Sequence, residues 1–417
     1  MRVHSRRRQR QILLAVAVAV VPAQPARAQV TRDSAGIQVV ENARPVLAAG
    51  RAWRIDPAPT ITIGANPADA DTLNELLLVM GVTRLSDDRF AVGVQASHAI
   101  RFYDARGGYL GFAGRRGEGP GEFKQLMGVH AIRGDTLFIT DNGEVELFTS
   151  DGKFVGQGAS QARGVRFVYP TVVFSDGSYL GILRDDNAVP PAGRARRPWP
   201  VARISRDGMR IDTIGSMLSS EEVFDGRLPF GRSVAFSQRS LLAGDAGRFF
   251  VASPLRSEIV QFDLTGRAIR RILLPARNER VSDEAIRALR EWYLSMPGEN
   301  GQPLPPAMRA RREQSLERTV YADRFPSFGN LLVDRARNLW AQRFDYHSAF
   351  LTPGPVRTQT MSVASTWDVL DPEGRWLCTV QLPARFTPLE IGSDYVAGLA
   401  RDEDEVEQVR VYRLLKP

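Results

Sequence analysis

The chain has 417 residues but only one cysteine, Cys378. A single cysteine has no intrachain partner, so no disulfide can support the fold. Cys378 lies in a strand-like run, residues 375–380, and a lone thiol there is best explained as buried and inert. A nucleophilic thiol would need an accessible position and a nearby base, and nothing close to Cys378 in the sequence indicates one.

The N-terminal segment lacks an apolar run long enough to span a bilayer as an ordinary helix. Residues 12–21 are apolar, arginines precede them, and Ala26-Arg27-Ala28 follows as a small-x-small cleavage signal. We therefore predict that residues 1–28 are a signal peptide removed after Ala28, and that the protein is periplasmic or secreted. The alternative is an N-terminal anchor that is retained. No cysteine lies near the cleavage site, which excludes a lipoprotein.

The expected mature chain also lacks a large excess of charge. The whole chain has 55 Lys+Arg against 47 Asp+Glu, but six arginines belong to the predicted signal peptide, which leaves 49 against 47. Nucleic-acid binding would need a clustered basic face. The densest cluster, Arg194, Arg196 and Arg197, stands among prolines and is typical of a solvated loop. We expect no nucleic-acid partner, and no membrane association after cleavage.

Glycine recurs at one position in five hairpin-like segments. Each segment has an apolar strand, a turn with glycine at its fourth position, and a second strand. That position predicts a tight turn with a positive φ, which glycine adopts without steric cost. The aligned glycines are Gly107, Gly152, Gly208, Gly266 and Gly374, spaced by 45, 56, 58 and 108 residues. The first three intervals each fit one four-stranded propeller blade.

Residues 282–323 break the β pattern within the longest interval. Ser282 can cap a helix whose first turn holds Asp283 and Glu284. A proline- and glycine-rich stretch follows, and a second, polar helix is expected over residues 309–319. Without these roughly 42 residues the interval shrinks to about 66, one blade with a long loop. We predict a helical insertion between blades 4 and 5, with Trp292 and Tyr293 as a lid or partner surface.

The last repeat unit begins at residues 389–391 and ends one strand short. Residues 53–55 or 60–64 can add the missing outer strand, which would leave no gap between the first and last blades. The sequence thus predicts an all-β fold, a six-bladed β-propeller formed by residues 29–417 as one domain. The alternative, a β-sandwich followed by a separate domain, explains neither the glycine spacing nor the missing strand.

Two motifs narrow the kind of propeller. Residues 114–123 read GRRGEGPGEF, and residues 139–148 read ITDNGEVELF. Together they resemble the NHL-repeat β-propellers, in which a glycine-rich crossing leads into an inner strand and an Asp-x-x-Asn/Asp turn leads into the third strand. This resemblance covers about residues 102–156. The whole chain also resembles bacterial exported six-bladed propellers with a helical insertion and no assigned chemistry, which implies a fold but hardly a function.

Oxygen ligands for a metal are sparse in the predicted channel. Calcium-dependent lactonases and gluconolactonases with a propeller fold use Glu, Asn and Asp oxygens, because Ca²⁺ takes hard ligands. Glu75, Asn142 and Asp345 are candidates by rough location, but no motif aligns them. Each is better explained as a turn or rim residue.

The histidines give a second set of candidate metal ligands, and no motif aligns these either. The amidating lyases of NHL type hold a metal with three channel histidines, and after cleavage this chain retains His98, His130 and His347. His130 lies in an inner-strand run, whereas the other two lie in loops that would rarely converge with it. We assign no cofactor, and calcium and zinc remain the ions to test.

The remaining candidates indicate recognition rather than catalysis. No nucleophile elbow accompanies a Ser/His/Asp set, so covalent hydrolysis has no support. A predicted rim could grip a polar or anionic ligand, although structural turns explain the same residues; it consists of Arg115, Arg116, Asp141, Asn142, Asp345 and Tyr346. With His130 on its inner strand, these residues are the candidate ligand-binding set. We therefore predict a non-catalytic module that binds a peptide, glycan or protein. The alternatives are a metal-dependent lactonase or lyase, and a structural ring in an envelope assembly.

Overall fold

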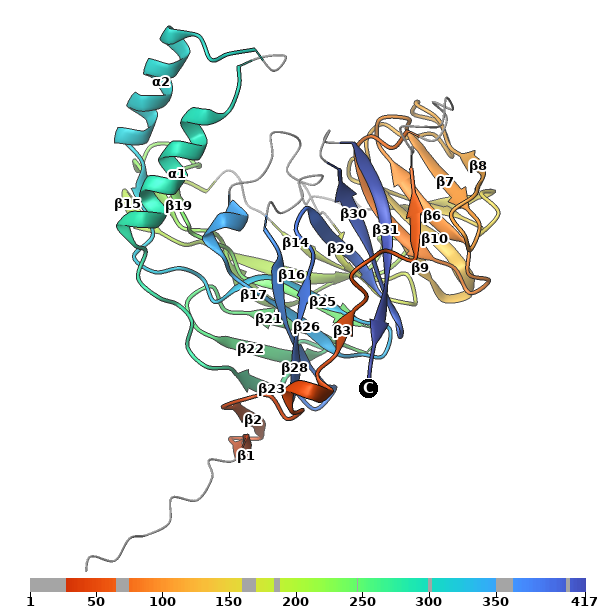
Figure 1. Cartoon of the computed structure of the whole chain (residues 1–417), viewed down its shortest axis with the longest axis horizontal. Coiled ribbons are helices and arrows are strands. Elements are labelled where there is room, and N and C mark those ends of the chain that lie inside the picture. The colour runs from red at the N-terminus through yellow and green to blue at the C-terminus, as the bar shows by residue number, and fades with distance from the viewer. Residues whose placement is uncertain are drawn as a thin grey trace, which may run out of the picture.

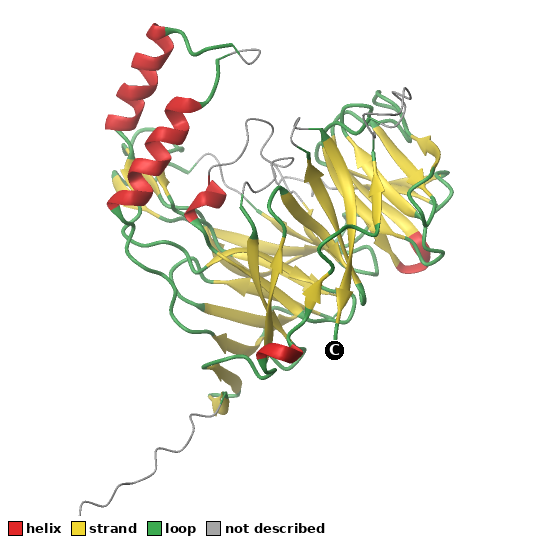
Figure 2. Ribbon diagram, in the orientation of Figure 1, coloured by secondary structure: helices red, strands yellow, loops and turns green. Residues whose placement is uncertain are grey.

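The computed structural model describes residues 28–64, 75–159, 170–183, 188–245, 247–298, 302–349, 363–402 and 406–417. Nearly all of the predicted signal peptide therefore lies outside the described residues. Strands are the main regular element of the described chain, and helices are confined to one hairpin and a few short turns (Figures 1 and 2). Among the described residues, neither of the two α-helices is long and apolar enough to cross a membrane.

Antiparallel four-stranded sheets follow one another along the chain. The first two sheets contain β5 (Val79–Arg84), β6 (Phe90–Val94), β7 (Ala99–Tyr103) and β8 (Tyr109–Ala113), then β9 (Leu126–Ile132), β10 (Thr136–Asp141), β11 (Glu144–Phe148) and β12 (Phe154–Ala159). The next contains β13 (Pro170–Val173), β14 (Tyr179–Ile182), β16 (Pro198–Ile204) and β17 (Ile211–Leu218).

The series continues to the end of the chain. It runs through β20 (Leu241–Asp245), β21 (Arg248–Ala252), β22 (Glu258–Asp263) and β23 (Ala268–Leu273), then β25 (Phe328–Val333), β26 (Leu339–Arg343), β27 (Ser365–Leu370) and β28 (Trp376–Leu382). The last sheet contains β29 (Phe386–Ile391), β30 (Tyr395–Arg401) and β31 (Glu407–Leu415). Each sheet is a meander, because its strands pair in the order in which the chain forms them, although β15 (Gly193–Ala195), between β14 and β16, belongs to another sheet.

These sheets close into a ring. Their first strands touch in turn, β5 with β9, β13 with β20, β20 with β25, β25 with β29 and β29 with β5. The backbone N–H of Arg133, after β9, donates to the carbonyl of Ser175, after β13, at 2.9 Å and joins the remaining pair. Every neighbouring pair of sheets also shares a buried apolar cluster. Radial sheets packed face to face around a central axis are a β-propeller.

The aligned glycines turn the outer hairpins, as their spacing predicts. Gly107, Gly152, Gly208, Gly266 and Gly374 have φ values of 89°, 79°, 70°, 88° and 80°. At Gly266 an added Cβ atom would also lie 2.1 Å from the carbonyl oxygen of Ile214 in the neighbouring sheet. Glycine is therefore required there for both its backbone conformation and its lack of a side chain.

The N-terminal segment completes the last sheet. The sequence offers two candidates for the missing strand, and the structure uses both, because β3 (Arg54–Ile55) and β4 (Ile61–Ile63) each pair antiparallel with β31. Upstream, β1 (Gln29–Ser34) and β2 (Ile37–Asn42) form a hairpin that extends the sheet of β20–β23, since β2 runs parallel to β23. Residues 29–63 thus form a strap along the outer edges of three consecutive sheets.

Two helices lie between β23 and β25 and project from the ring (Figure 1). Helix α1 (Asp283–Ser295) begins where predicted, and the Ser282 side chain accepts a hydrogen bond from the Ala285 N–H at 3.2 Å. Helix α2 (Pro306–Glu317) begins earlier than the predicted residue 309, because Pro306 can occupy the first helical position without losing a hydrogen bond. A small additional sheet of β15 (Gly193–Ala195), β18 (Glu222–Phe224), β19 (Arg232–Ala235) and β24 (Val320–Tyr321) supports the base of α1.

Candidate binding channel

A cavity of about 540 Å³ lies on the axis of the ring. Its wall contains residues of β5, β9, β13, β20, β25 and β29, the first strand of each sheet in the ring. The wall combines apolar side chains, among them Val82, Val129 and Leu389, with a comparable share of polar and charged groups. A volume of this size suits a small molecule or a short segment of a polymer.

Glu390 on β29 is the centre of the polar part of the wall. Its carboxylate accepts hydrogen bonds from the Thr83 hydroxyl at 2.7 Å, the Arg84 N–H at 3.2 Å and the Tyr395 hydroxyl. The Arg335 guanidinium completes the set with an ion pair at 3.1 Å. Three sheets thus meet at one carboxylate, and its acceptor positions are filled by the protein itself.

Tyr395 is held between two guanidinium groups. The Arg84 carbon lies 4.9 Å and the Arg335 carbon 6.0 Å from the centre of its ring. Burial, together with the Glu390 carboxylate, raises the pKa of the Tyr395 hydroxyl. The tyrosine therefore stays protonated and donates to Glu390, which makes this cluster a rigid part of the wall rather than a source of protons.

His130 on β9 lines the channel, and it is the one predicted ligand-binding residue in the cavity wall. Its side chain is exposed to the space of the channel, but its position inside the ring of sheets removes much of the surrounding bulk water and lowers its pKa to about 4. The imidazole is therefore neutral at pH 7 and presents one donor and one acceptor nitrogen to the channel. The run around residue 130 predicted this inner-strand position.

One mouth of the channel carries charged groups in the turns after the first strands. Asp135 accepts two hydrogen bonds from Ser86, from its N–H at 3.0 Å and its hydroxyl at 2.5 Å. Asp245 pairs with Arg248 and with Arg337, each at 3.1 Å. The acids at this mouth therefore link neighbouring sheets.

The predicted Arg115–Asn142 part of the rim is structural. Asp141 is 1% exposed, and its carboxylate accepts from the Lys124 and Gln125 N–H groups at 2.8 and 2.5 Å. Burial raises the pKa of this carboxyl group. Asn142 turns the chain with a φ of 32°, and Arg115 pairs with Glu122 at 2.7 Å. These residues fix the glycine-rich crossing, and Asp141 cannot contact a ligand.

The other predicted rim residues, Arg116, Asp345 and Tyr346, do not line the channel cavity. Arg116 is exposed and forms a backbone bridge to Phe123 in the crossing. Tyr346 stacks on Phe325 with ring centres 5.9 Å apart and belongs to the apolar cluster beneath α1. Asp345 accepts hydrogen bonds from the His347 N–H and ring, both at 2.9 Å. Tyr346 therefore helps to anchor the helical hairpin.

The candidate metal ligands are likewise dispersed. Glu75 precedes β5, His98 sits in the β6–β7 turn with its ring nitrogen 3.0 Å from the Phe123 carbonyl oxygen, and His347 lies in a short 3-10 turn, Tyr346–Ala349. Within the part of the chain that the structure describes, no group of three His, Cys, Asp or Glu residues could hold a metal ion. The sequence candidates are thus not brought into one site.

Trp292 and Tyr293, the predicted partner surface, belong to the helical hairpin, and Tyr293 makes contacts within it. Arg312 of α2 donates to the carbonyls of Tyr293, Met296 and Pro297 at 3.0, 2.6 and 3.1 Å, and its guanidinium lies over the Tyr293 ring. A cation at the carboxyl end of α1 stabilises that helix through its dipole. Trp292 is half-buried, so neither aromatic side chain is freely exposed.

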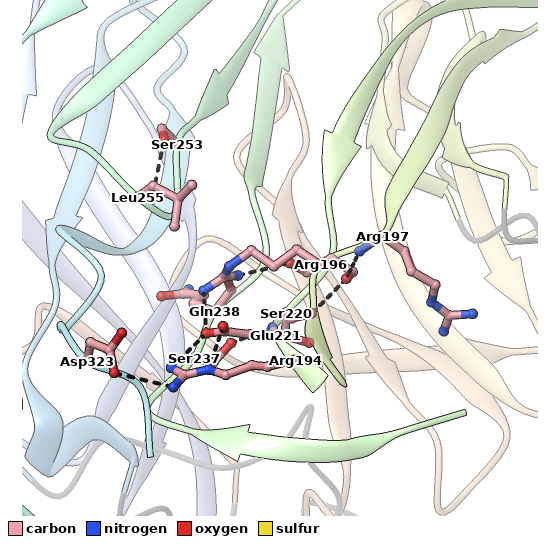
Figure 3. Close-up of polar contacts among 11 residues, drawn as sticks. Arg194, Arg196, Arg197, Ser220, Glu221, Ser237, Gln238, Ser253, Leu255 and Asp323 are labelled. Carbon is pink, nitrogen blue, oxygen red and sulfur yellow. Dashed lines mark hydrogen bonds and ion pairs between the residues drawn. The ribbon is translucent and has the colours of Figure 1, made fainter. Parts of the chain in front are cut away.

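The arginine cluster at 194–197 corrects our expectation of a solvated loop. Arg194 makes two hydrogen bonds to Glu221 at 2.6 and 3.2 Å and pairs with Asp323 at 3.3 Å (Figure 3). Arg196 is largely buried and donates to the carbonyls of Ser219 and Gln238 at 3.0 and 2.6 Å. Burial lowers the pKa of Arg196. Glu221 directly precedes β18 and Asp323 follows β24, so Arg194 holds together strands of the additional sheet that come from separate segments of the chain.

Comparisons with known proteins assign no family to this chain. No protein-family model and no curated protein matches the sequence. Similar solved structures include a member of the DUF4221 family from Bacteroides vulgatus, with a TM-score of 0.49, 10% identity, and 88% and 99% of the two chains covered. An exported protein from Bacteroides fragilis has a TM-score of 0.45, 10% identity and coverage of 91% and 99%.

A gluconolactonase from Xanthomonas campestris is also similar, with a TM-score of 0.42, 13% identity and coverage of 89% and 99%. All three likenesses are too distant to carry an argument. The fold assignment therefore rests on the sheets, the apolar clusters between them and the closed ring.

Proposed function

We propose that this chain is an exported, six-bladed, NHL-like β-propeller that binds a small molecule, or a short peptide or glycan segment, in its channel without transforming it. The observation that supports this most is the cavity of about 540 Å³ on the ring axis, whose wall is supplied by the first strands of the sheets. Apolar side chains and polar groups share this wall, and the neutral His130 imidazole offers one donor and one acceptor, so a ligand with both apolar and polar parts would fit it.

A binding role is favoured over catalysis because the Glu390 carboxylate in the channel wall is already occupied by hydrogen bonds within the protein. The Glu390 carboxylate already accepts hydrogen bonds from Thr83, Arg84 and Tyr395 and pairs with Arg335. A general acid or base needs a proton-transfer position directed at the substrate. The metal-dependent lactonase or lyase alternative needs converging ligands, and its candidates Glu75, His98, His130 and His347 lie in separate elements.

Channel binding can be tested with a side chain that fills the cavity. In His130→Trp the indole would occupy the space that a ligand needs. The matched control is Met209→Trp, because Met209 is 76% exposed on an outer turn. A thermal-shift screen of short peptides and oligosaccharides against the mature chain should give hits that His130→Trp loses and Met209→Trp keeps. Hits that bind equally to both variants would place the site outside the channel.

The same sample tests the metal alternative. Elemental analysis of the purified mature chain, with a calcium and zinc titration of its thermal midpoint, should show no stoichiometric ion and no stabilisation. A bound ion with a clear rise in midpoint would contradict the non-catalytic proposal and direct attention to lactone and amidated-peptide substrates.

Export is supported by the N-terminal sequence. The apolar run at 12–21 and the Ala26-Arg27-Ala28 signal precede β1, whose first residue is Gln29. N-terminal sequencing of the chain recovered from the periplasm or medium should begin at Gln29. Recovery of the intact N-terminus in the membrane fraction would instead support a retained anchor.

A further inference from the structure

A second cavity, separate from the channel, lies at the seam where the strap meets the last strand, β31. It has a volume of about 560 Å³ and is bordered by the short helix Ala49–Arg51, by β3, by the β29–β30 connection and by the last residues of β31. Figure 1 shows β3 beside the C-terminus at one side of the ring. None of the residues that line this cavity also lines the channel.

Two arginines on one face of this seam line the cavity. Arg54 lies opposite Leu415 in the β3–β31 ladder, and Arg413 stands two residues before Leu415 on the same strand. Residues directly opposite each other, and residues two apart on a strand, share a face of the sheet. Arg54 and Arg413 are therefore diagonal neighbours on that face, roughly 7–8 Å apart at the backbone.

Neither guanidinium group has a protein counterion. Both side chains are exposed, and among the described residues they have no hydrogen bond or ion pair. Like charges placed next to each other on a sheet are unfavourable unless something neutralises them. Two arginine side chains that face one cavity can offer several N–H donors to a single oxyanion, which is the geometry in which arginine binds phosphate.

The remaining charged groups of the cavity leave this pair uncompensated. Lys416 lies 4.3 Å from the centre of the Trp53 ring, which fixes its position beside the cavity. Asp394 is close enough to Lys416 to act on its charge. The side chains that line the cavity thus include three basic groups and one acidic group, so a positive charge remains at the arginines.

From this arrangement we infer that the seam cavity is a second binding site, one that takes a phosphate group or a chemically similar tetrahedral oxyanion between Arg54 and Arg413. The site does not depend on ligand binding in the channel. Because β3 and β31 come from opposite ends of the chain, an anion here would also neutralise the junction that closes the ring.

Titration calorimetry of the mature chain with inorganic phosphate at low salt tests the site. Phosphate should bind the wild type, and Arg54→Ala and Arg413→Ala should each weaken it about tenfold, because each removes a charge-assisted contact. The matched control is Arg106→Ala, since Arg106 is an exposed arginine on the β7–β8 turn, and it should bind as the wild type does. Raising the salt concentration should weaken binding to the wild type.

Folding is monitored separately by the thermal midpoint without phosphate. Exposed side chains contribute little to stability, so all three variants should unfold near the wild-type temperature. Absence of binding to the wild type, or equal affinity in wild type, Arg54→Ala and Arg413→Ala, would overturn the proposal. Loss of binding in Arg106→Ala as well would overturn it too, because the effect would then follow overall charge rather than this pair.

Discussion

Asn42 and Trp376 are joined by a hydrogen bond across most of the chain. The Trp376 N–H donates to the Asn42 side-chain oxygen at 2.9 Å, although 334 residues separate the two in sequence. The Asn42 side-chain nitrogen donates in turn to the Gly374 carbonyl at 3.0 Å. One side chain of the strap therefore fixes the outer strand of a sheet formed near the other end of the chain.

Removal of this side chain should loosen the strap. In Asn42→Ala the Trp376 N–H and the Gly374 carbonyl lose their partner, and because Asn42 is 4% exposed, water cannot replace it readily. We expect the free energy of unfolding to fall by about 1–3 kcal/mol in a urea titration. Arg32→Ala, which removes only an exposed ion pair with Glu41, should change it by less than about 1 kcal/mol. Equal losses in the two variants would contradict the role of Asn42.

A buried ion pair within the last sheet is hydrogen-bonded to the first sheet. Glu407 is 2% exposed, pairs with Arg401 at 2.8 Å and accepts a hydrogen bond from the Val79 N–H at 2.8 Å. Glu407→Gln would remove the carboxylate charge that the buried Arg401 guanidinium faces at 2.8 Å, which should lower the free energy of unfolding by about 3–5 kcal/mol. Glu144→Gln, which weakens only a surface pair with Lys124, should cost about 1 kcal/mol or less. If chemical denaturation gave similar losses of unfolding free energy for Glu407→Gln and Glu144→Gln, the contact between the last and first sheets would not depend on the Arg401–Glu407 pair.

The stability of the fold should depend on glycine at position 266, where both the backbone conformation and the close approach of the neighbouring sheet exclude a side chain. Gly266→Ala would place a residue with a side chain at a φ of 88° and its Cβ against the Ile214 carbonyl oxygen. The expected loss is about 2 kcal/mol or more, from backbone strain and displacement of the neighbouring strand. Gly156→Ala is the control, because no atom lies within 4 Å of its added Cβ and its φ is not positive. Thermal unfolding measures both variants, and the midpoint should fall clearly in Gly266→Ala but little in Gly156→Ala.

His130 should make stability depend on acid pH. Enclosure lowers its pKa from 6.5 to about 4 in the folded chain, so the unfolded chain binds the proton more readily. The free energy of unfolding should therefore decrease as the pH falls from about 6.5 to about 4, and His130→Gln should lack this part of the slope. Urea titrations at several pH values measure it. Identical slopes in the two chains would contradict the enclosed position of the imidazole.

Much of the fold follows from local sequence signals. The glycine turns have the positive φ values that their spacing predicts, and Ser282 caps the first helix. The shortage of one strand in the last unit indicates that the N-terminus must contribute, and β3 and β4 both do so. These features can be predicted from the sequence because a tight turn, a helix cap and a strand each depend on residues close together in the chain.

The features that sequence reasoning missed depend on distant partners. The parallel pairing of β2 with β23 joins segments more than two hundred residues apart, and no local pattern marks it. Arg194 and Arg196 look like a solvated basic loop until Glu221 is placed beside them. Glu390 was not predicted as a channel residue, because a single acid in a strand gives no sign that Thr83, Arg335 and Tyr395 converge on it.

The most direct test of the central claim, that the ring binds its ligand in the channel, is an NMR titration that follows the His130 ring resonances. A ligand from the thermal-shift screen is added to the mature chain while the His98, His130 and His347 ring signals are recorded. The structure predicts that the His130 signals move with the same midpoint as binding, because the imidazole faces the cavity. Saturable binding that leaves the His130 signals unchanged would contradict the channel as the binding site.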